Sequence, residues 1–197
     1  MPRETRTITE ADILPLDEWA GLRVEHRKAL SLRKRSRRLS VGPHATLYFE
    51  NWDTMWYQVQ EMLWIEKGGA AQLPDELAAY NPLIPNGREF TATLMFEIPD
   101  EAKRKIVLGE LGGVEDCISL SIGGTRIAAT YETEVERTKE DGKTSSVHFL
   151  HFPLTDAAAA QFKNCSVEAM VRIDHPNYGH AALIGEAVRA ELVGDLA

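Results

Sequence analysis

The sequence predicts an α+β protein with a mainly antiparallel sheet, helices packed on that sheet and an N-terminal helical segment. Apolar residues alternate with other residues between Phe90 and Ile98, which is the period of a strand. Trp52, Trp56 and Trp64 recur at multiples of four residues, which is the period of a helix. From residue 89 onward the patterns follow the order strand, helix, strand, strand, strand, helix, strand, and this order favours an α+β layer architecture.

The first half of the chain supplies the other expected elements. Thr9 to Asp12 resembles a capped turn, and Pro15 begins a helix that ends in the basic run 33–38. Residues 45–49 read as a strand after a Gly-Pro turn signal. Asp53 is the expected cap of the Trp-rich helix. A competing interpretation makes residues 55–59 the second strand of a hairpin, because Met55, Tyr57 and Val59 also alternate.

Length and composition set the domain organisation. A chain of 197 residues with 44% hydrophobic residues can bury one core without disulfides. We expect a helical basic arm over residues 1–38, a single α+β domain over residues 39–197, and an exposed charged connection between residues 132 and 143. No apolar run reaches the length of a membrane span, and the N-terminus lacks the apolar segment of a signal peptide. We therefore expect a cytoplasmic protein without a membrane partner, with Cys117 and Cys165 as reduced thiols.

Charge is distributed unevenly. Eight basic residues and one acidic residue lie between Gly21 and Arg38, so this segment carries +7 while the other residues carry −15 within the net charge of −8. The basic segment could dock on the protein's own acidic surface, on a second subunit or on an anionic partner. Nucleic acid is disfavoured, because the acidic remainder repels phosphates and no aromatic residues interleave the basic run.

The sequence contains neither a GxGxxG or GxxxxGK[ST] phosphate loop nor a GxSxG nucleophile elbow, which disfavours nucleotide chemistry and serine hydrolysis. A narrow polar line, Thr54, Gln58 and Glu61, follows one side of the Trp-rich helix. This line either faces water or directs Gln58 and Glu61 into an internal ligand site.

The histidines form the candidate metal set. Histidine nitrogens and carboxylate oxygens together suit iron, manganese or zinc. His148 and His151 lie three residues apart on an expected strand and point to opposite faces, so at most one of them can join a site. The alternative is that all of these histidines are surface or hydrogen-bonded structural residues. The metal candidates are His44, Glu61, Asp174, His175 and His180.

Four segments carry a resemblance to a known family: 41–44 (VGPH), 57–63 (YQVQEML), 80–85 (YNPLIP) and 174–178 (DHPNY). Together they resemble domain-of-unknown-function family 3501, which is bacterial, and the likeness covers nearly the whole chain. The resemblance implies a stand-alone protein whose genes are associated with those of rubrerythrin-like and iron-sulfur oxidoreductase proteins. No catalytic residues are carried over from that family.

We therefore expect an accessory protein linked to iron or oxidative-stress metabolism, with a homo-oligomeric state and a redox or iron-linked partner. Its metal or small-ligand site would use the metal candidates together with Gln58 and Tyr178. The alternative is a non-catalytic interaction module that uses the basic helix and the Trp-rich surface.

Overall fold

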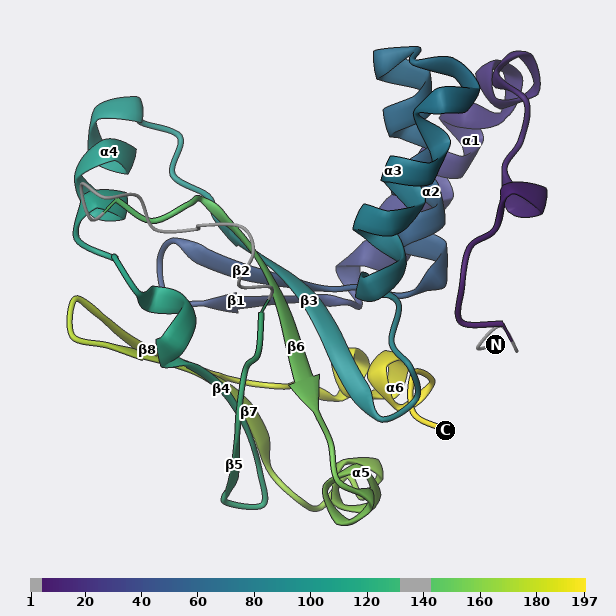
Figure 1. Ribbon diagram of the computed structural model, residues 1–197. Coiled ribbons are helices and arrows are strands. Elements are labelled where there is room, and N and C mark those ends of the chain that lie inside the picture. The colour runs from purple at the N-terminus through teal and green to yellow at the C-terminus, as the bar shows by residue number, and fades with distance from the viewer. Residues whose placement is uncertain (1–4, 132–142) are drawn as a thin grey trace.

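The computed structural model describes residues 5–131 and 143–197, and it confirms the α+β class (Figure 1). The expected connection between residues 132 and 143 lies outside these ranges, except for Lys143. The α-helices are α1 (Leu16–Arg35), α2 (Trp52–Glu66), α3 (Leu73–Tyr80), α4 (Glu101–Gly109), α5 (Asp156–Lys163) and α6 (Glu186–Val193). The strands are β1 (Arg38–Val41), β2 (Ala45–Phe49), β3 (Glu89–Phe96), β4 (Ile118–Ile122), β5 (Thr125–Ala128), β6 (Val147–Pro153), β7 (Ala169–His175) and β8 (Tyr178–Leu183). Every helix in the described ranges is too short or too polar to span a lipid bilayer.

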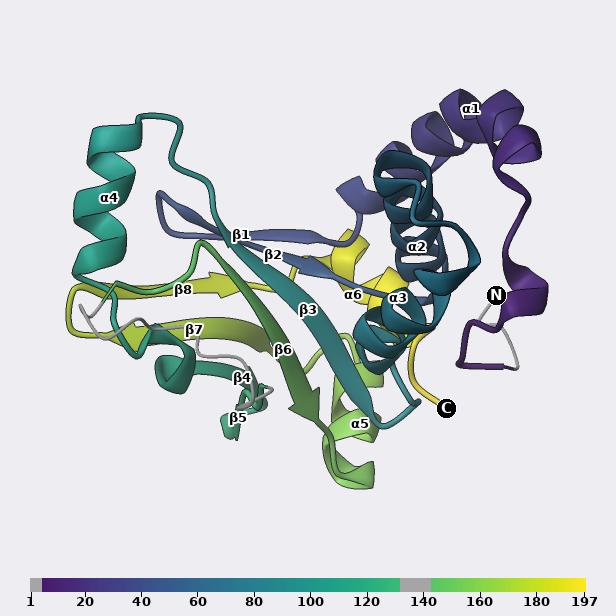
Figure 2. The ribbon, with the colours of Figure 1, turned by 45° about the horizontal axis from the view of Figure 1, so that its top comes forward.

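The strands form two antiparallel sheets of four strands, in the orders β1-β2-β3-β6 and β5-β4-β7-β8. The sequence predicted one sheet and did not predict β1 or β8, each of which is an outer strand of its own sheet. An isolated bridge between Thr130 and His151 joins the sheets at one side, and β1 contacts β8 at the other. The sheets therefore enclose a shared interior (Figure 2).

The interior holds the main hydrophobic core. The alternation seen in the sequence places Phe90, Leu94 and their neighbours inside, where they meet Leu120 and Val171 from the other sheet. Phe162 from α5 closes one end, with its ring 4.7 Å from that of Phe90. Burial of this many large apolar side chains is the main stabilising contribution to the two-sheet unit.

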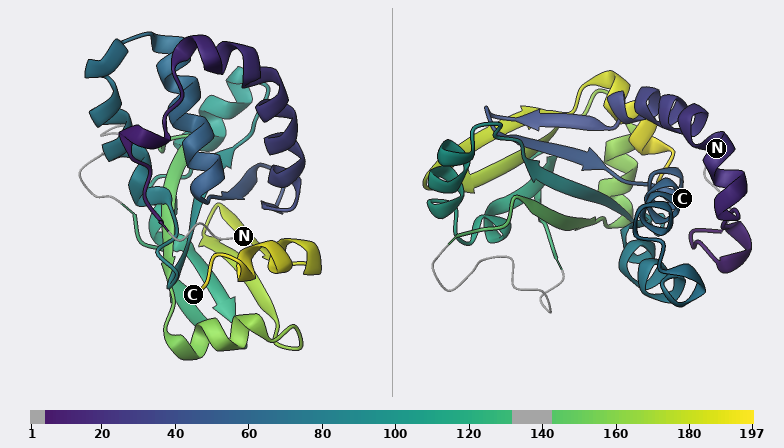
Figure 3. Two further views of the ribbon diagram at one scale, coloured as in Figure 1. Left: turned by 90° about the vertical axis from the view of Figure 1, so that its right-hand side faces the viewer. Right: turned by 90° about the horizontal axis from the view of Figure 1, so that it is seen from above.

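A second, smaller core lies outside the sheets. The helices α1, α2 and α3 stand together at one end of the molecule, with the N-terminal segment along them (Figure 3). Ile8, Met55, Val59 and Leu83 are buried among them. Trp19 of α1 is fully buried with its ring edge-on to that of Trp56 of α2, at 5.5 Å. The aromatic period seen in the sequence therefore packs helix against helix.

Two expectations about α2 are wrong. Residues 55–59 are helical, so the hairpin interpretation fails. Asn51, and not Asp53, caps the helix: its side-chain oxygen accepts from the Thr54 backbone N–H at 3.0 Å, and the Thr54 hydroxyl accepts from the Asn51 N–H at 2.9 Å. The two residues form a reciprocal capping box. Asp53 instead pairs with Arg33 of α1.

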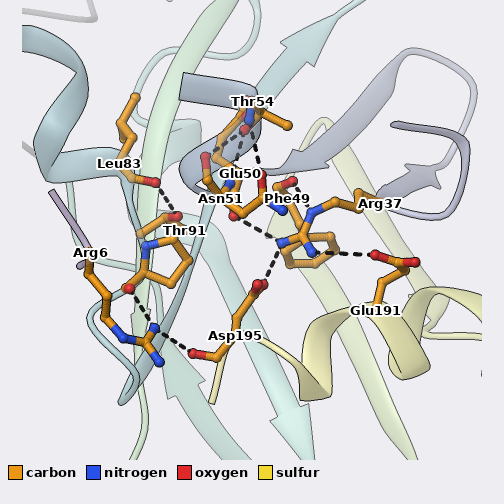
Figure 4. A network of polar contacts seen from close by, with 11 residues as sticks. Arg6, Arg37, Phe49, Glu50, Asn51, Thr54, Leu83, Thr91, Glu191 and Asp195 are labelled. Atoms are coloured by element: carbon orange, nitrogen blue, oxygen red, sulfur yellow. Dashed lines mark hydrogen bonds and ion pairs between the residues drawn. The ribbon is translucent and has the colours of Figure 1, made fainter. Parts of the chain in front are cut away.

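The guanidinium of Arg37, 2% exposed, joins α1, the first sheet and the C-terminal segment (Figure 4). It donates to the carbonyl oxygens of Phe49 and Glu50, each at 2.9 Å, and to the carboxylate of Asp195. Arg6 donates to the backbone oxygens of Pro85 and Asp195, each at 2.8 Å. Burial raises the pKa of Asp195 more than the charge of Arg37 lowers it. This network holds both ends of the chain against the sheet.

The capping box predicts a specific loss of stability. Asn51→Ala removes the acceptor for the Thr54 N–H, so it should lower the free energy of unfolding by about 1 kcal/mol. Asp53→Ala removes only a partly exposed ion pair and should cost less than about 1 kcal/mol. Urea unfolding of the two variants measures the difference. A larger loss for Asp53→Ala would show that Asp53 is the effective cap.

The buried ion pair predicts a larger loss. Arg37→Met leaves the carboxylate of Asp195 buried without its partner and should cost about 3–5 kcal/mol. Arg33→Met removes an exposed arginine in the last turn of α1, four residues before Arg37, and should cost less than about 1 kcal/mol. Urea unfolding at neutral pH compares them. Equal small losses would contradict the role given to Arg37.

Candidate functional site

The structure places the predicted metal candidates in three separate regions. His44 and His180 lie around Tyr178, where the β1–β2 turn meets β8. Asp174 and His175 lie at the end of β7, and Glu61 lies on α2. In the described ranges, no three side chains from His, Cys, Asp and Glu are grouped so that they could hold a metal ion. The five candidates are therefore not brought together.

Tyr178, a predicted ligand residue, fastens the β1–β2 turn. Its hydroxyl accepts from the backbone N–H groups of His44 and Ala45, each at 2.9 Å, and donates to the carbonyl oxygen of Val41 at 2.8 Å. Gly42 has a φ of +71°, and a Cβ there would lie 2.5 Å from the His180 ring. The close approach therefore requires glycine. These contacts give Tyr178 and Gly42 a structural role, because they hold the β1–β2 turn against β8.

Asp174 and His175 point to opposite faces of β7. The Asp174 carboxylate faces outward and pairs with Arg126 at 3.1 Å and with Arg172 at 3.2 Å. His175 is buried, with Nδ1 accepting from the Asn177 N–H at 3.2 Å and Nε2 lying 3.3 Å from the carbonyl oxygen of Gly112. Both ring nitrogens of His175 are thus in use.

Glu61 joins α2 to α1. Arg23 donates to both of its carboxylate oxygens, at 2.6 and 2.8 Å, and the Trp19 indole donates at 3.2 Å. Burial raises the pKa of Glu61, but Arg23 and the other hydrogen-bond donors outweigh that effect and lower it below its ordinary value. Glu61 is therefore a charged acceptor between two helices.

His148 and His151 point to opposite faces of β6, as predicted. His148 is 1% exposed, and its Nε2 lies 2.9 Å from the carbonyl oxygen of Ser145. The Nδ1 of His151 lies 3.1 Å from the carboxylate of Glu89 on the outer face.

Gln58, the remaining predicted ligand residue, lines a cavity of about 350 Å³ between the helices and the outer face of the first sheet. The floor of the cavity is formed by Tyr48, Thr93 and Phe149. These residues lie side by side because the strand register pairs them across β2, β3 and β6. Met55 and Gln58 of α2 form one wall. The lining residues are Lys34, Tyr48, Glu50, Met55, Gln58, Tyr80, Leu83, Thr93, Met95, Val147 and Phe149.

Glu50 is the buried acid of this cavity, with 4% of its surface exposed. Its backbone is fixed from both sides, because its N–H donates to the Thr91 carbonyl at 2.9 Å and its carbonyl accepts from Arg37. Its Oε1 accepts from the Thr93 hydroxyl at 2.7 Å. Its buried Oε2 has no hydrogen-bond partner in the described part of the chain. A buried carboxylate oxygen without a donor costs free energy that a suitable ligand could recover.

Tyr80 and Gln58 add polar groups to the cavity wall. The Gln58 amide nitrogen lies 3.5 Å from the Tyr80 hydroxyl, at the limit of a hydrogen bond. Burial raises the pKa of Tyr80 above its ordinary value of 10.0, although the contact with Gln58 lowers it. The phenol therefore stays protonated at neutral pH and remains a neutral donor.

Two other cavities, of about 380 and 510 Å³, lie beside α1 and share Arg33, Trp52 and Asp53. Their charged groups satisfy one another: Arg33 pairs with Asp53, and Arg37 pairs with Asp195. The smaller cavity at Glu50 is the stronger candidate, since it holds an unsatisfied acid among apolar walls.

The fold and the Glu50 cavity define an α+β protein with a small-molecule-sized pocket, and comparison with known proteins then gives the family. The family model described as "Protein of unknown function (DUF3501)" matches residues 7–196, so the chain belongs to that family. The resemblance found in the sequence is confirmed. A comparison with curated proteins gives no match. A crystal structure of a "novel protein of unknown function" from Burkholderia pseudomallei K96243 is similar, with a TM-score of 0.89 and 37% identity over 97% of this chain and 100% of that chain.

Tyr178 predicts a pH-dependent effect. Tyr178→Phe leaves two backbone N–H groups without an acceptor and should cost about 2 kcal/mol or more at neutral pH. Burial raises the pKa of Tyr178 above 10.0, against the backbone hydrogen bonds that lower it. The native state then holds the phenolic proton more tightly than the unfolded state, so the stabilisation is complete below the ordinary pKa and is lost as the pH rises above it.

The stability gap between the wild type and Tyr178→Phe should therefore be constant up to about pH 9 and should narrow above about pH 10. Urea unfolding across this range measures the gap. His44→Ala is the control, because the hydrogen bond from His44 to Tyr178 comes from the backbone N–H, which this substitution keeps. A gap that widens above pH 10 would contradict this account.

Proposed function

We propose that this protein binds a small organic molecule in the cavity at Glu50. The observation that carries the proposal is the buried Oε2 of Glu50, which has no partner among the described residues and belongs to a residue that lines the cavity. Cavities of about 300–1,000 Å³ with apolar walls and a few convergent polar groups are typical small-molecule sites. The Glu50 cavity, at about 350 Å³, lies at the lower end of that range.

The chemistry of the walls indicates the kind of ligand. Met55, Leu83, Met95 and Phe149 offer apolar contact to a hydrocarbon or aromatic body. A positively charged amine would donate to the free oxygen of Glu50 and neutralise a buried charge, which makes a strong hydrogen bond. We infer that the ligand carries an amine or a similar cationic donor on an apolar body.

The same residues favour binding over catalysis. Among the described residues that line the cavity there is no histidine or cysteine, and the Tyr80 phenol stays protonated at neutral pH. The described lining therefore lacks the Cys–His or Ser–His pair that many nucleophilic enzymes use. The proposed role is therefore that of a binding protein for a small amine, and it does not depend on iron, manganese or zinc.

Glu50→Gln tests the proposal with phenethylamine as the cationic probe and 2-phenylethanol as its neutral analogue. Wild-type protein should bind the amine at least about tenfold more tightly than the alcohol, because one charge-assisted hydrogen bond is worth about 1.5–3 kcal/mol. Glu50→Gln keeps the shape but removes the charge, and it should abolish the preference. Titrations followed by amide NMR shifts give both affinities and locate the site at Gln58, Thr93 and Phe149.

Glu186→Gln is the matched control, because Glu186 is an exposed acid at the start of α6. It removes the same charge and should keep the preference for the amine. Equal binding of the two probes by the wild type, or shifts that map away from the cavity, would refute the proposal.

A further inference from the structure

A groove lined by cations shares Lys34 and Tyr48 with the Glu50 cavity. It has a volume of about 400 Å³ and lies between the C-terminal half of α1, the start of β1, and residues of β2 and α2. Four of its residues are cationic, and no aspartate or glutamate lines it within the described ranges. Its lining residues are Arg27, Leu30, Ser31, Lys34, Arg35, Arg38, Tyr48 and Tyr57.

Helix geometry concentrates these cations. Arg27, Ser31, Lys34 and Arg35 occupy positions i, i+4, i+7 and i+8 of α1, which lie on one face of a helix. Like charges gathered on one face of a helix repel one another, so an anion bound between them would relieve an unfavourable interaction. Cations near a helix C-terminus also interact favourably with the helix dipole. The dipole alone does not account for Arg38, which belongs to β1 and faces the same groove.

Most of this positive charge is uncompensated. Within residues 5–131 and 143–197, no carboxylate lies within 4.0 Å of the charged groups of Arg27, Lys34 or Arg35. By contrast, Arg23, Arg33 and Arg37 of the same basic segment each pair with an acid. The basic segment therefore contains three arginines that bind α1 to the protein and three cations, Arg27, Lys34 and Arg35, that line the groove without an acidic partner among the described residues.

Arg38 and the tyrosines shape the groove. Arg38 contacts the carboxylate of Glu97 at 3.4 Å, and its guanidinium lies 5.6 Å from the centre of the Tyr48 ring. The Tyr48 hydroxyl donates to the carboxylate of Glu97 at 2.8 Å, and Glu97 itself does not line the groove. Burial raises the pKa of both Tyr48 and Tyr57, so their phenols add no negative charge at neutral pH. The groove thus presents cations and neutral aromatic walls.

We propose that this groove binds the phosphate group of a small phosphorylated molecule, through Arg27, Lys34 and Arg35. Guanidinium groups suit phosphate because they donate two parallel hydrogen bonds. A long polyanion fits less well, since the residues outside the basic segment carry a net charge of −15 and would repel it. The inference goes beyond the amine-binding proposal and does not need Glu50, although Lys34 and Tyr48 border both spaces.

Pyrophosphate at constant ionic strength tests the proposal by isothermal titration calorimetry, and amide NMR shifts locate the binding. Wild-type protein should bind pyrophosphate more tightly than orthophosphate, because more charge contacts the cations. Arg27→Gln with Arg35→Gln should weaken binding by about tenfold or more. Lys28→Gln with Lys105→Gln removes the same charge from exposed positions outside the groove and should change affinity less than about twofold.

Three results would overturn the proposal. The first is that no binding is detected with pyrophosphate at about 10 mM, because an affinity weaker than this is too low for a specific phosphate site. The second is equal weakening in the two double variants, which would mean that only net charge matters. The third is that the protein binds a single-stranded oligonucleotide more tightly than pyrophosphate, which would identify a nucleic-acid-binding surface. Thermal melting confirms that each variant is folded, and Glu50→Gln should leave pyrophosphate binding intact, so this test is separate from that of the amine site.

Discussion

The buried guanidinium of Arg37 is the contact on which the arrangement of the two proposed sites depends. It donates hydrogen bonds to the carbonyl oxygen of Phe49, the last residue of β2, and to that of Glu50. It also pairs with Asp195 near the C-terminus. A buried charge is tolerated only where partners of this kind surround it. Arg37 lies between the end of α1 and the start of β1, so its side chain ties both to the C-terminal segment at Asp195.

The pocket and the groove both follow from that position. The carbonyl of Glu50 accepts from Arg37, so its backbone is held while its side chain reaches the cavity beside Thr93. The residues just before Arg37 form the cationic face of α1, and Arg38 just after it starts the sheet. One buried side chain thus places an unsatisfied acid on one side of Lys34 and unpaired cations on the other.

Local patterns were sufficient to predict most elements but not their partners. The strand at residues 90–96 and the helix with the tryptophans follow from their periods. β1 was missed because its alternation covers only four residues, and β8 was missed because its residues do not alternate. Gln58 was predicted as a ligand residue from its polar line. Glu50 was missed, although an acid directly after a buried strand of five residues was the available signal, because its burial depends on α2 and on Thr93.

The two-residue period of a strand determines where several of the candidate metal ligands point. His148 and His151 were assigned to opposite faces from strand geometry alone, and the structure agrees. The same geometry applies to Asp174 and His175, which are adjacent on β7: one pairs with surface arginines and the other is buried. Neighbouring strand residues point apart, so they could not ligate one ion without a bulge. The residue types alone suggested the donor set, whereas the two-residue period of the strand already argued that Asp174 and His175 could not both belong to it.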